Sequence, residues 1–134
     1  GVRFWQIQEM THELAKMDLT FEKRNPVTSL MTNTSTGDLR EDILNEKILS
    51  AIVEFKTSLR NVPAILRKVK EVANRLDTVV AIGAAARCDA NGDNDLEEIL
   101  RQEEFRFVRG KTNLGLGRAS NAVPLAEEAA VSVM

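Results

Sequence analysis

Oxygen-bearing side chains occupy the first, third, fifth and seventh positions of the segment 89–95, as they do in a calcium-binding loop. The sixth position is Asn94, where the sharp turn of such a loop needs glycine. The twelfth is Leu100, where a calcium loop carries a bidentate glutamate. Asn94 is followed three residues later by Glu97, which is a helix-capping pattern. We therefore expect a solvated acidic turn that caps a helix, and no metal site.

His12 and Cys88 are the only histidine and the only cysteine, and could pair as a base and a nucleophile. No sequence pattern brings them together, and one of each cannot supply a usual zinc ligand set. The glycines of Gly115-Leu116-Gly117 lack the third glycine of a dinucleotide fingerprint and do not join a strand to a helix. We predict that the chain is not an enzyme and needs no cofactor.

Charge is distributed unevenly along the chain, although the net charge is only −2. The segment 56–75 has six basic residues and one acidic, 89–104 has seven acidic and one basic, and 105–118 has four basic and none acidic. Such segments can pair within the chain or between subunits, or the basic ones can face an anionic partner. The candidates for contacts with nucleic acid, without sequence specificity, are Arg60, Arg67, Lys68, Arg75, Arg106, Arg109, Lys111 and Arg118.

The N-terminal segment from Phe4 to about Leu19 has apolar residues at steps of three and four, which predicts an amphipathic helix. The stretch from Pro26 to Gly37 is rich in Thr, Ser and Asn and is expected to be a loop. Overlapping capping patterns predict that the next helix begins near Asp38.

The longest periodic signal runs from Asn45 to Val80, where apolar residues recur at alternating steps of three and four for about five heptads. The flanking g positions are apolar too, which favours a helical bundle over a two-stranded coiled coil. The predicted oligomer or packing face consists of Ile48, Ile52, Phe55, Leu59, Leu66, Val69, Leu76 and Val80.

Pro63 interrupts this stripe and leaves two alternatives. Either one long helix kinks there, or the helix breaks and a second one starts with proline in its first turn. The unbroken apolar phase favours a kink. The segment from Val79 to Ala86 carries no charge, so we expect it to be buried or to lie at a subunit contact.

These patterns predict an all-α fold, a helical bundle around one long helix kinked at Pro63. The chain has 134 residues, 43% of them hydrophobic, which suits a single core. The bundle domain is expected to span 1–110, with 111–134 as a flexible C-terminal arm or short helix.

The apolar face of so long a helix is more than the shorter helices of the chain could cover. We therefore expect a structural or assembly protein that forms homo-oligomers through helical faces, such as a coat, a scaffold or an oligomerisation domain. The alternative is a nucleic-acid-packaging or RNA-binding helical protein that uses the basic face 56–75 and the segment 105–118.

No apolar run approaches the roughly 18 residues of a membrane span, and the N-terminus shows no apolar core of a signal peptide. The lone thiol favours a reducing compartment. We expect an intracellular protein or a component of an assembled particle, without contact with a membrane.

Overall fold

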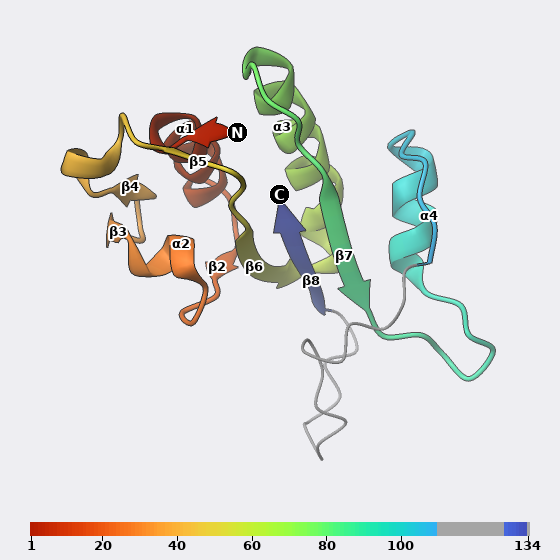
Figure 1. Cartoon of the computed structure of the whole chain (residues 1–134). Helices are drawn as coiled ribbons and strands as arrows, with labels where there is room; N and C mark the ends of the chain where they lie inside the picture. Colours follow the sequence, from red (N-terminus) through yellow and green to blue (C-terminus); the bar gives the residue numbers. More distant parts are fainter. Residues whose placement is uncertain (110–127, 134) are drawn as a thin grey trace.

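The computed structural model describes residues 1–109 and 128–133, and within them the chain folds as a mixed α/β protein (Figure 1). The prediction of an all-α bundle is therefore wrong. The elements in chain order are β1 (Val2–Arg3), α1 (Phe4–Ala15), β2 (Thr20–Phe21), α2 (Pro26–Ser29), β3 (Met31–Asn33), β4 (Asp38–Leu39), the 3₁₀ helix η1 (Glu41–Ile43), β5 (Lys47–Ile48), β6 (Val53–Ser58), the 3₁₀ helix η2 (Leu59–Asn61), α3 (Val62–Arg75), β7 (Ile82–Ala86), α4 (Asp95–Gln102) and β8 (Glu128–Val133).

The largest sheet has the strand order β2-β6-β8-β7, with every neighbouring pair antiparallel. Since β6 and β7 both run antiparallel to β8, they are parallel to each other, and α3 connects them as in a split β-α-β unit. The register aligns Phe55 of β6 and Ala84 of β7 with Val131 of β8. In Figure 1, α3 lies behind the sheet. α1 lies to the left of α3 in this view, beyond the connection from β5 to β6. Two short pairs, β1 with β5 and β3 with β4, complete the described strands.

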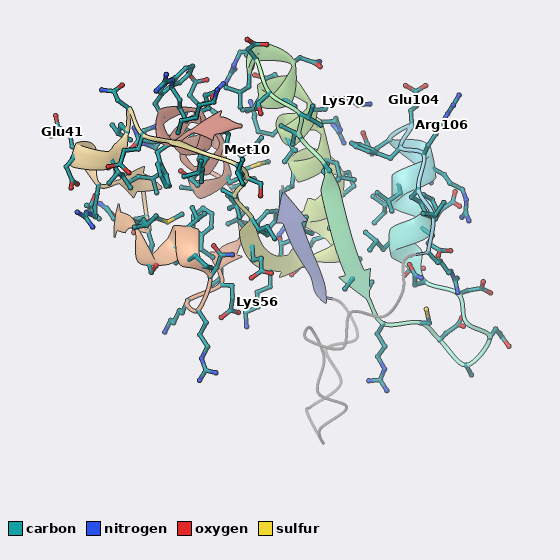
Figure 2. The ribbon with its side chains drawn as sticks, viewed as in Figure 1. Met10, Glu41, Lys56, Lys70, Glu104 and Arg106 are labelled. Carbon is teal, nitrogen blue, oxygen red and sulfur yellow. The ribbon has the colours of Figure 1, made fainter. Side chains whose placement is uncertain are left out.

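The core forms where α1, α3 and the sheet meet. The predicted N-terminal helix is confirmed, and its buried apolar residues include Ile7, Met10 and Leu14 at the expected spacing. Val69 and Val72 of α3 are almost completely buried. Figure 2 shows Met10 on the side of α1 that faces β6 and α3.

The segment 45–80 does not form one long helix. Its first part becomes β5 and β6, and in β6 the residues alternate, with Val53, Phe55 and Thr57 buried. Ile52, a member of the predicted stripe, is 42% exposed, whereas its neighbour Val53 is 4% exposed. The period of two therefore overrides the steps of three and four, because pairing with β2 and β8 satisfies the backbone of β6 on both sides.

The residues of the predicted oligomer face are consequently divided among several elements. Most of them pack in the core of their own chain, so the long uncovered helical face does not exist. Phe55, Leu66 and Val69 are buried; Ile48, Leu59, Leu76 and Val80 are partly buried against the core; Ile52 is exposed.

Pro63 marks a break and not a kink. The chain leaves β6 through η2, and α3 begins at Val62 with Pro63 in its first turn. A backbone N–H in the first turn of a helix has no intrahelical acceptor, so proline loses nothing there. The expected helix start at Asp38 is also wrong, since this residue belongs to β4.

Part of the predicted C-terminal arm belongs to the fold. Residues 128–133 form β8, which pairs along its whole length with β6 and over five residues with β7. Residues 111–127 and 134 lie outside the described residues.

We predict that the core position Val72 and the surface position Val108 respond differently to the same substitution. Val72 is 0% exposed and Val108 is 89% exposed. Val72→Ala should lower the free energy of unfolding by about 2 kcal/mol, because it removes two buried methyl groups and leaves a cavity. Val108→Ala should change it by less than about 0.5 kcal/mol. Urea unfolding of both variants measures the difference, and equal effects would contradict the assignment of α3 to the core.

Candidate functional site

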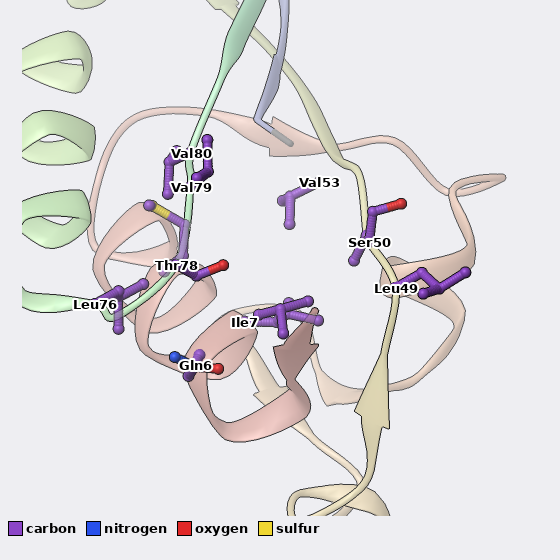
Figure 3. A pocket seen from close by; sticks show the side chains of 12 residues that line it. Gln6, Ile7, Leu49, Ser50, Val53, Leu76, Thr78, Val79 and Val80 are labelled. Atoms are coloured by element: carbon purple, nitrogen blue, oxygen red, sulfur yellow. The ribbon is translucent and has the colours of Figure 1, made fainter.

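An apolar pocket opens at the surface where the core reaches the edge of the fold (Figure 3). It lies between the connection from β5 to β6 and the connection from α3 to β7. Its volume is about 90 Å³. Nine of its lining residues are apolar and three are polar: Val2, Ile7, Met10, Leu49, Ala51, Val53, Leu76, Val79 and Val80, with Gln6, Ser50 and Thr78.

The walls of the pocket are extensions of the core. Ile7 and Met10 come from the buried face of α1, and Val53 is the first residue of β6. Figure 3 shows Leu49 and Val79 on opposite sides of the pocket, with Ile7 and Val53 between them. Core residues therefore form the floor of the pocket, and two connecting segments form its walls.

Leu49 and Val79 are the most exposed large apolar residues beside the pocket. The exposed fraction is 95% for Leu49 and 90% for Val79. Full burial of a side chain of this size stabilises a protein or a complex by about 1.5–3 kcal/mol. Leu49 and Val79 make almost none of this contribution in the isolated chain. Exposed apolar residues gathered around an apolar pocket are typical of a binding surface for another protein.

The chemistry that the pocket can support is limited by its lining and size. None of the lining residues is ionisable, so the pocket offers no general acid, base or metal ligand. Pockets for cofactors and drug-sized ligands usually measure about 300–1,000 Å³. A volume of about 90 Å³ suits one apolar side chain.

A second group of polar residues connects α1 with the turn between β3 and β4. His12 Nε2 lies 2.7 Å from Asp38 Oδ1, and the Thr36 hydroxyl donates to Asp38 Oδ2 at 2.5 Å. The Thr36 hydroxyl, and then His12, lower the pKa of Asp38 below its ordinary value of 3.8. Because the Thr36 proton points to the carboxylate and not to the imidazole, the group lacks the nucleophile–base contact of covalent catalysis.

This turn is held against α1 by a close backbone approach. The Thr11 hydroxyl donates to the carbonyl oxygen of Gly37 at 2.7 Å. Gly37 has a φ of +77°, and a Cβ at this position would lie 2.3 Å from the carbonyl oxygen of Thr11. Only glycine satisfies both the backbone angle and the contact.

His12 and Cys88 are not paired with each other. His12 contacts Asp38, whereas the exposed Cys88 accepts a hydrogen bond from the side chain of Asn94. The capping prediction is confirmed, since Asn94 Oδ1 accepts from the backbone N–H of Glu97 at the start of α4. Within residues 1–109 and 128–133, no three His, Cys, Asp or Glu side chains are arranged to hold a metal ion.

The basic residues that the sequence suggested for nucleic acid lie mostly in ion pairs. Arg67 and Arg109 reach acidic residues of the α4 region, while Lys68 and Arg75 both pair with Glu71 on their own helix. Among the described residues, no ion pair involves Arg60 or Arg106. Lys111 and Arg118 lie outside the described residues.

The aromatic residues of the segment 105–109 are also engaged within the chain. Lys70 Nζ lies 4.7 Å from the centre of the Phe105 ring, and the Arg101 guanidinium lies 5.4 Å from that of Phe107. Figure 2 shows Lys70 on the side of α3 that faces α4. Basic α3 and acidic α4 therefore attract each other within the chain.

The sequence prediction missed the pocket, although one signal pointed to part of it. The charge-free segment from Val79 to Ala86, for which the sequence predicts burial or a subunit contact, contains Val79 and Val80 of the pocket lining. None of its residues is buried in the chain, and Val79 is 90% exposed. Leu49 lay beside the helical stripe and carried no signal of its own.

No protein-family model matches this sequence, and neither the curated proteins nor the solved structures include a match. In the described part of the chain, no helix combines the length and the apolar character that crossing a bilayer requires.

We predict that Gly37→Ala is more damaging than Gly92→Ala. Both glycines have φ near +80°, so both substitutions introduce backbone strain of about 1–2 kcal/mol. At Gly92 the nearest atom to an added Cβ is 3.9 Å away, whereas at Gly37 it is the Thr11 carbonyl oxygen. Thermal unfolding should show a clearly larger loss of stability for Gly37→Ala, and equal losses would exclude the close approach to α1.

We predict that Asp38 contributes to stability at neutral pH and not in acid. A carboxyl whose pKa is lowered in the folded state stabilises the protein above its unfolded pKa, and this stability is lost as the pH falls through the folded pKa. Asp38→Asn should therefore be less stable than the unchanged protein at pH 7, and the difference should vanish in acid. Urea unfolding between about pH 7 and about pH 2 measures it.

A double-mutant cycle assigns the cause of this pH effect. Thr36→Val removes the hydroxyl that contributes most to the low pKa of Asp38. Thr36→Val should reduce the pH dependence of the free energy of unfolding when it is introduced into the unchanged protein. When it is introduced into Asp38→Asn, it should not change that pH dependence further. Parallel stability curves for all four proteins would show that the pKa of Asp38 is not lowered.

Proposed function

We propose that this chain is a structural or assembly protein that self-associates through the surface around the apolar pocket. The observation that carries the proposal is the near-complete exposure of Leu49 and Val79 on either side of a pocket with no ionisable lining residue. The surface replaces the helical faces that the sequence suggested, since those residues pack mostly within their own core.

A second copy of the chain is the partner that this surface fits best. Leu49 protrudes beside a pocket of about the volume of one apolar side chain. A surface that carries a protruding side chain and a pocket next to each other can bind a copy of itself, with each copy giving one side chain and receiving one. The two exchanges would bury the exposed Leu49 of both copies.

The arrangement of the basic residues favours assembly over nucleic-acid binding. Four of the six described candidates pair with carboxylates, so their charge is partly neutralised before any phosphate approaches. The aromatic rings of Phe105 and Phe107 contact cations of the chain itself. Binding of an oligonucleotide would therefore oppose this proposal.

The proposal assigns no reaction to the chain. It places the protein in a reducing compartment or in an assembled particle, because Cys88 is exposed and a lone exposed thiol suits reducing conditions.

We predict that Leu49→Asp combined with Val79→Asp prevents self-association without unfolding the protein. The unchanged chain should sediment at about twice its 14.9 kDa mass at high salt, since apolar contacts survive screening. The double variant should sediment as a monomer, with a dissociation constant at least about 100-fold higher, because charges would be buried against apolar walls.

The matched control is Val108→Asp, which changes another exposed apolar residue away from the pocket. It should leave the mass unchanged, and circular dichroism should show the same fold for all variants. A monomeric unchanged protein at high concentration would overturn the proposal. A mass that rises only with a nonspecific oligonucleotide, and falls steeply with salt, would support the nucleic-acid alternative instead.

A further inference from the structure

The apolar pocket lies beyond the end of β8. This strand ends at Val133, which pairs with Val53 of β6 on one side and with Ile82 of β7 on the other. Figure 1 shows this end of β8 between the two neighbouring strands. Most residues of the segments that lead into them, 49–52 before β6 and 78–81 before β7, line the pocket from opposite sides (Figure 3). The pocket therefore occupies the line along which β8 would continue.

The backbone of these two wall segments, 49–52 and 78–81, is not engaged in the fold. Neither segment belongs to a helix or a strand, and within residues 1–109 and 128–133 neither forms a backbone hydrogen bond. On the side of β2, the N–H of Glu22 donates to the carbonyl of Glu54 at 2.9 Å. Because backbone groups alternate along a strand, those of Ala51 are directed to the opposite side, into the pocket.

A buried polar side chain also lines the pocket. Gln6 is 7% exposed, and its Oε1 accepts a hydrogen bond from the backbone N–H of Arg3 at 2.8 Å. The amide nitrogen of Gln6 has no hydrogen-bond partner among the described residues. A buried donor without an acceptor is unfavourable, so the occupant that suits the pocket combines an apolar side chain with an acceptor. An extended peptide segment offers both.

The wall segment 49–52 of a second copy meets these requirements. A segment in line with β8 runs antiparallel to both walls, as β8 does to β6 and β7. A two-fold axis perpendicular to the sheet sets two copies of one segment side by side and antiparallel. The segments then follow the order 78–81, 49–52 of the second copy, 49–52, and 78–81 of the second copy. One contact fills both pockets.

We infer that two copies join by exchanging strands, with 49–52 of each copy entering the pocket of the other in line with β8. The inference rests on the proposed self-association and adds the form of the contact. Leu49 provides the apolar side chain, and the backbone around it provides the hydrogen bonds that strand addition makes.

Proline at position 51 tests the backbone pairing. Ala51→Pro keeps a small apolar side chain but removes an N–H that is directed into the pocket. It should weaken self-association at least about tenfold, because a strand with neighbours on both sides does not accept proline. The matched control is Ala90→Pro, at an exposed turn position whose N–H forms no hydrogen bond in the described part of the chain. This control should associate as the unchanged chain does.

Amide hydrogen exchange is the second measurement, and it needs no substitution in the pocket. The amides of 49–52 and 78–81 should exchange rapidly in the dilute monomer and at least about tenfold more slowly in the dimer. The double variant Leu49→Asp with Val79→Asp should gain no such protection at high concentration.

The outcomes separate this inference from the proposed function. If the unchanged chain is monomeric at high concentration, the proposed function fails and the inference with it. If the chain dimerises but Ala51→Pro associates normally, or the wall segments exchange equally fast in monomer and dimer, the exchange of strands is wrong and self-association stands.

Discussion

The fold depends on the burial of the apolar face of α3 between the sheet and α1. Val62, Ile65, Leu66, Val69 and Val72 are each at most 1% exposed, and they cover one face of a sheet whose strands come from distant parts of the chain. Burial of five such side chains contributes on the order of 10 kcal/mol, comparable to the whole net stability of a domain. The same helix also connects β6 to β7 along the chain.

The apolar pocket is a consequence of the same packing. Ile7, Met10 and Val53 belong to the core and also line the pocket, so the core is continuous with the surface at this place. Beyond the last turn of α3, the chain passes Val79 on its way to β7 without another element to cover it. A second chain that supplies the missing cover would extend the core across the interface, as in obligate dimers.

The charged residues of α3 and α4 form contacts within the chain. On α3 and α4 they attract each other, with Arg67 Nε 3.1 Å from Glu103 Oε2, and they hold the two helices together at the surface. Such exposed pairs contribute little individually, but they neutralise a face that would otherwise attract polyanions.

Local sequence patterns were sufficient to predict the elements that depend only on neighbouring residues. The spacing of Ile7, Met10 and Leu14 sufficed for α1, and Asn94 sufficed for the start of α4, because a capping side chain acts on its own helix.

The strands and the pocket depend on contacts between distant parts of the chain. Over 53–58 Phe55 fits both periods, and the strand forms because β6 pairs with β2 and with β8, whose residues lie 70–80 positions later in the chain. The pocket is likewise non-local, since Leu49 and Val79 lie 30 residues apart in the sequence. A pairing or a pocket between distant segments has no periodic signature, because its partners are brought together only by the packing of the whole chain.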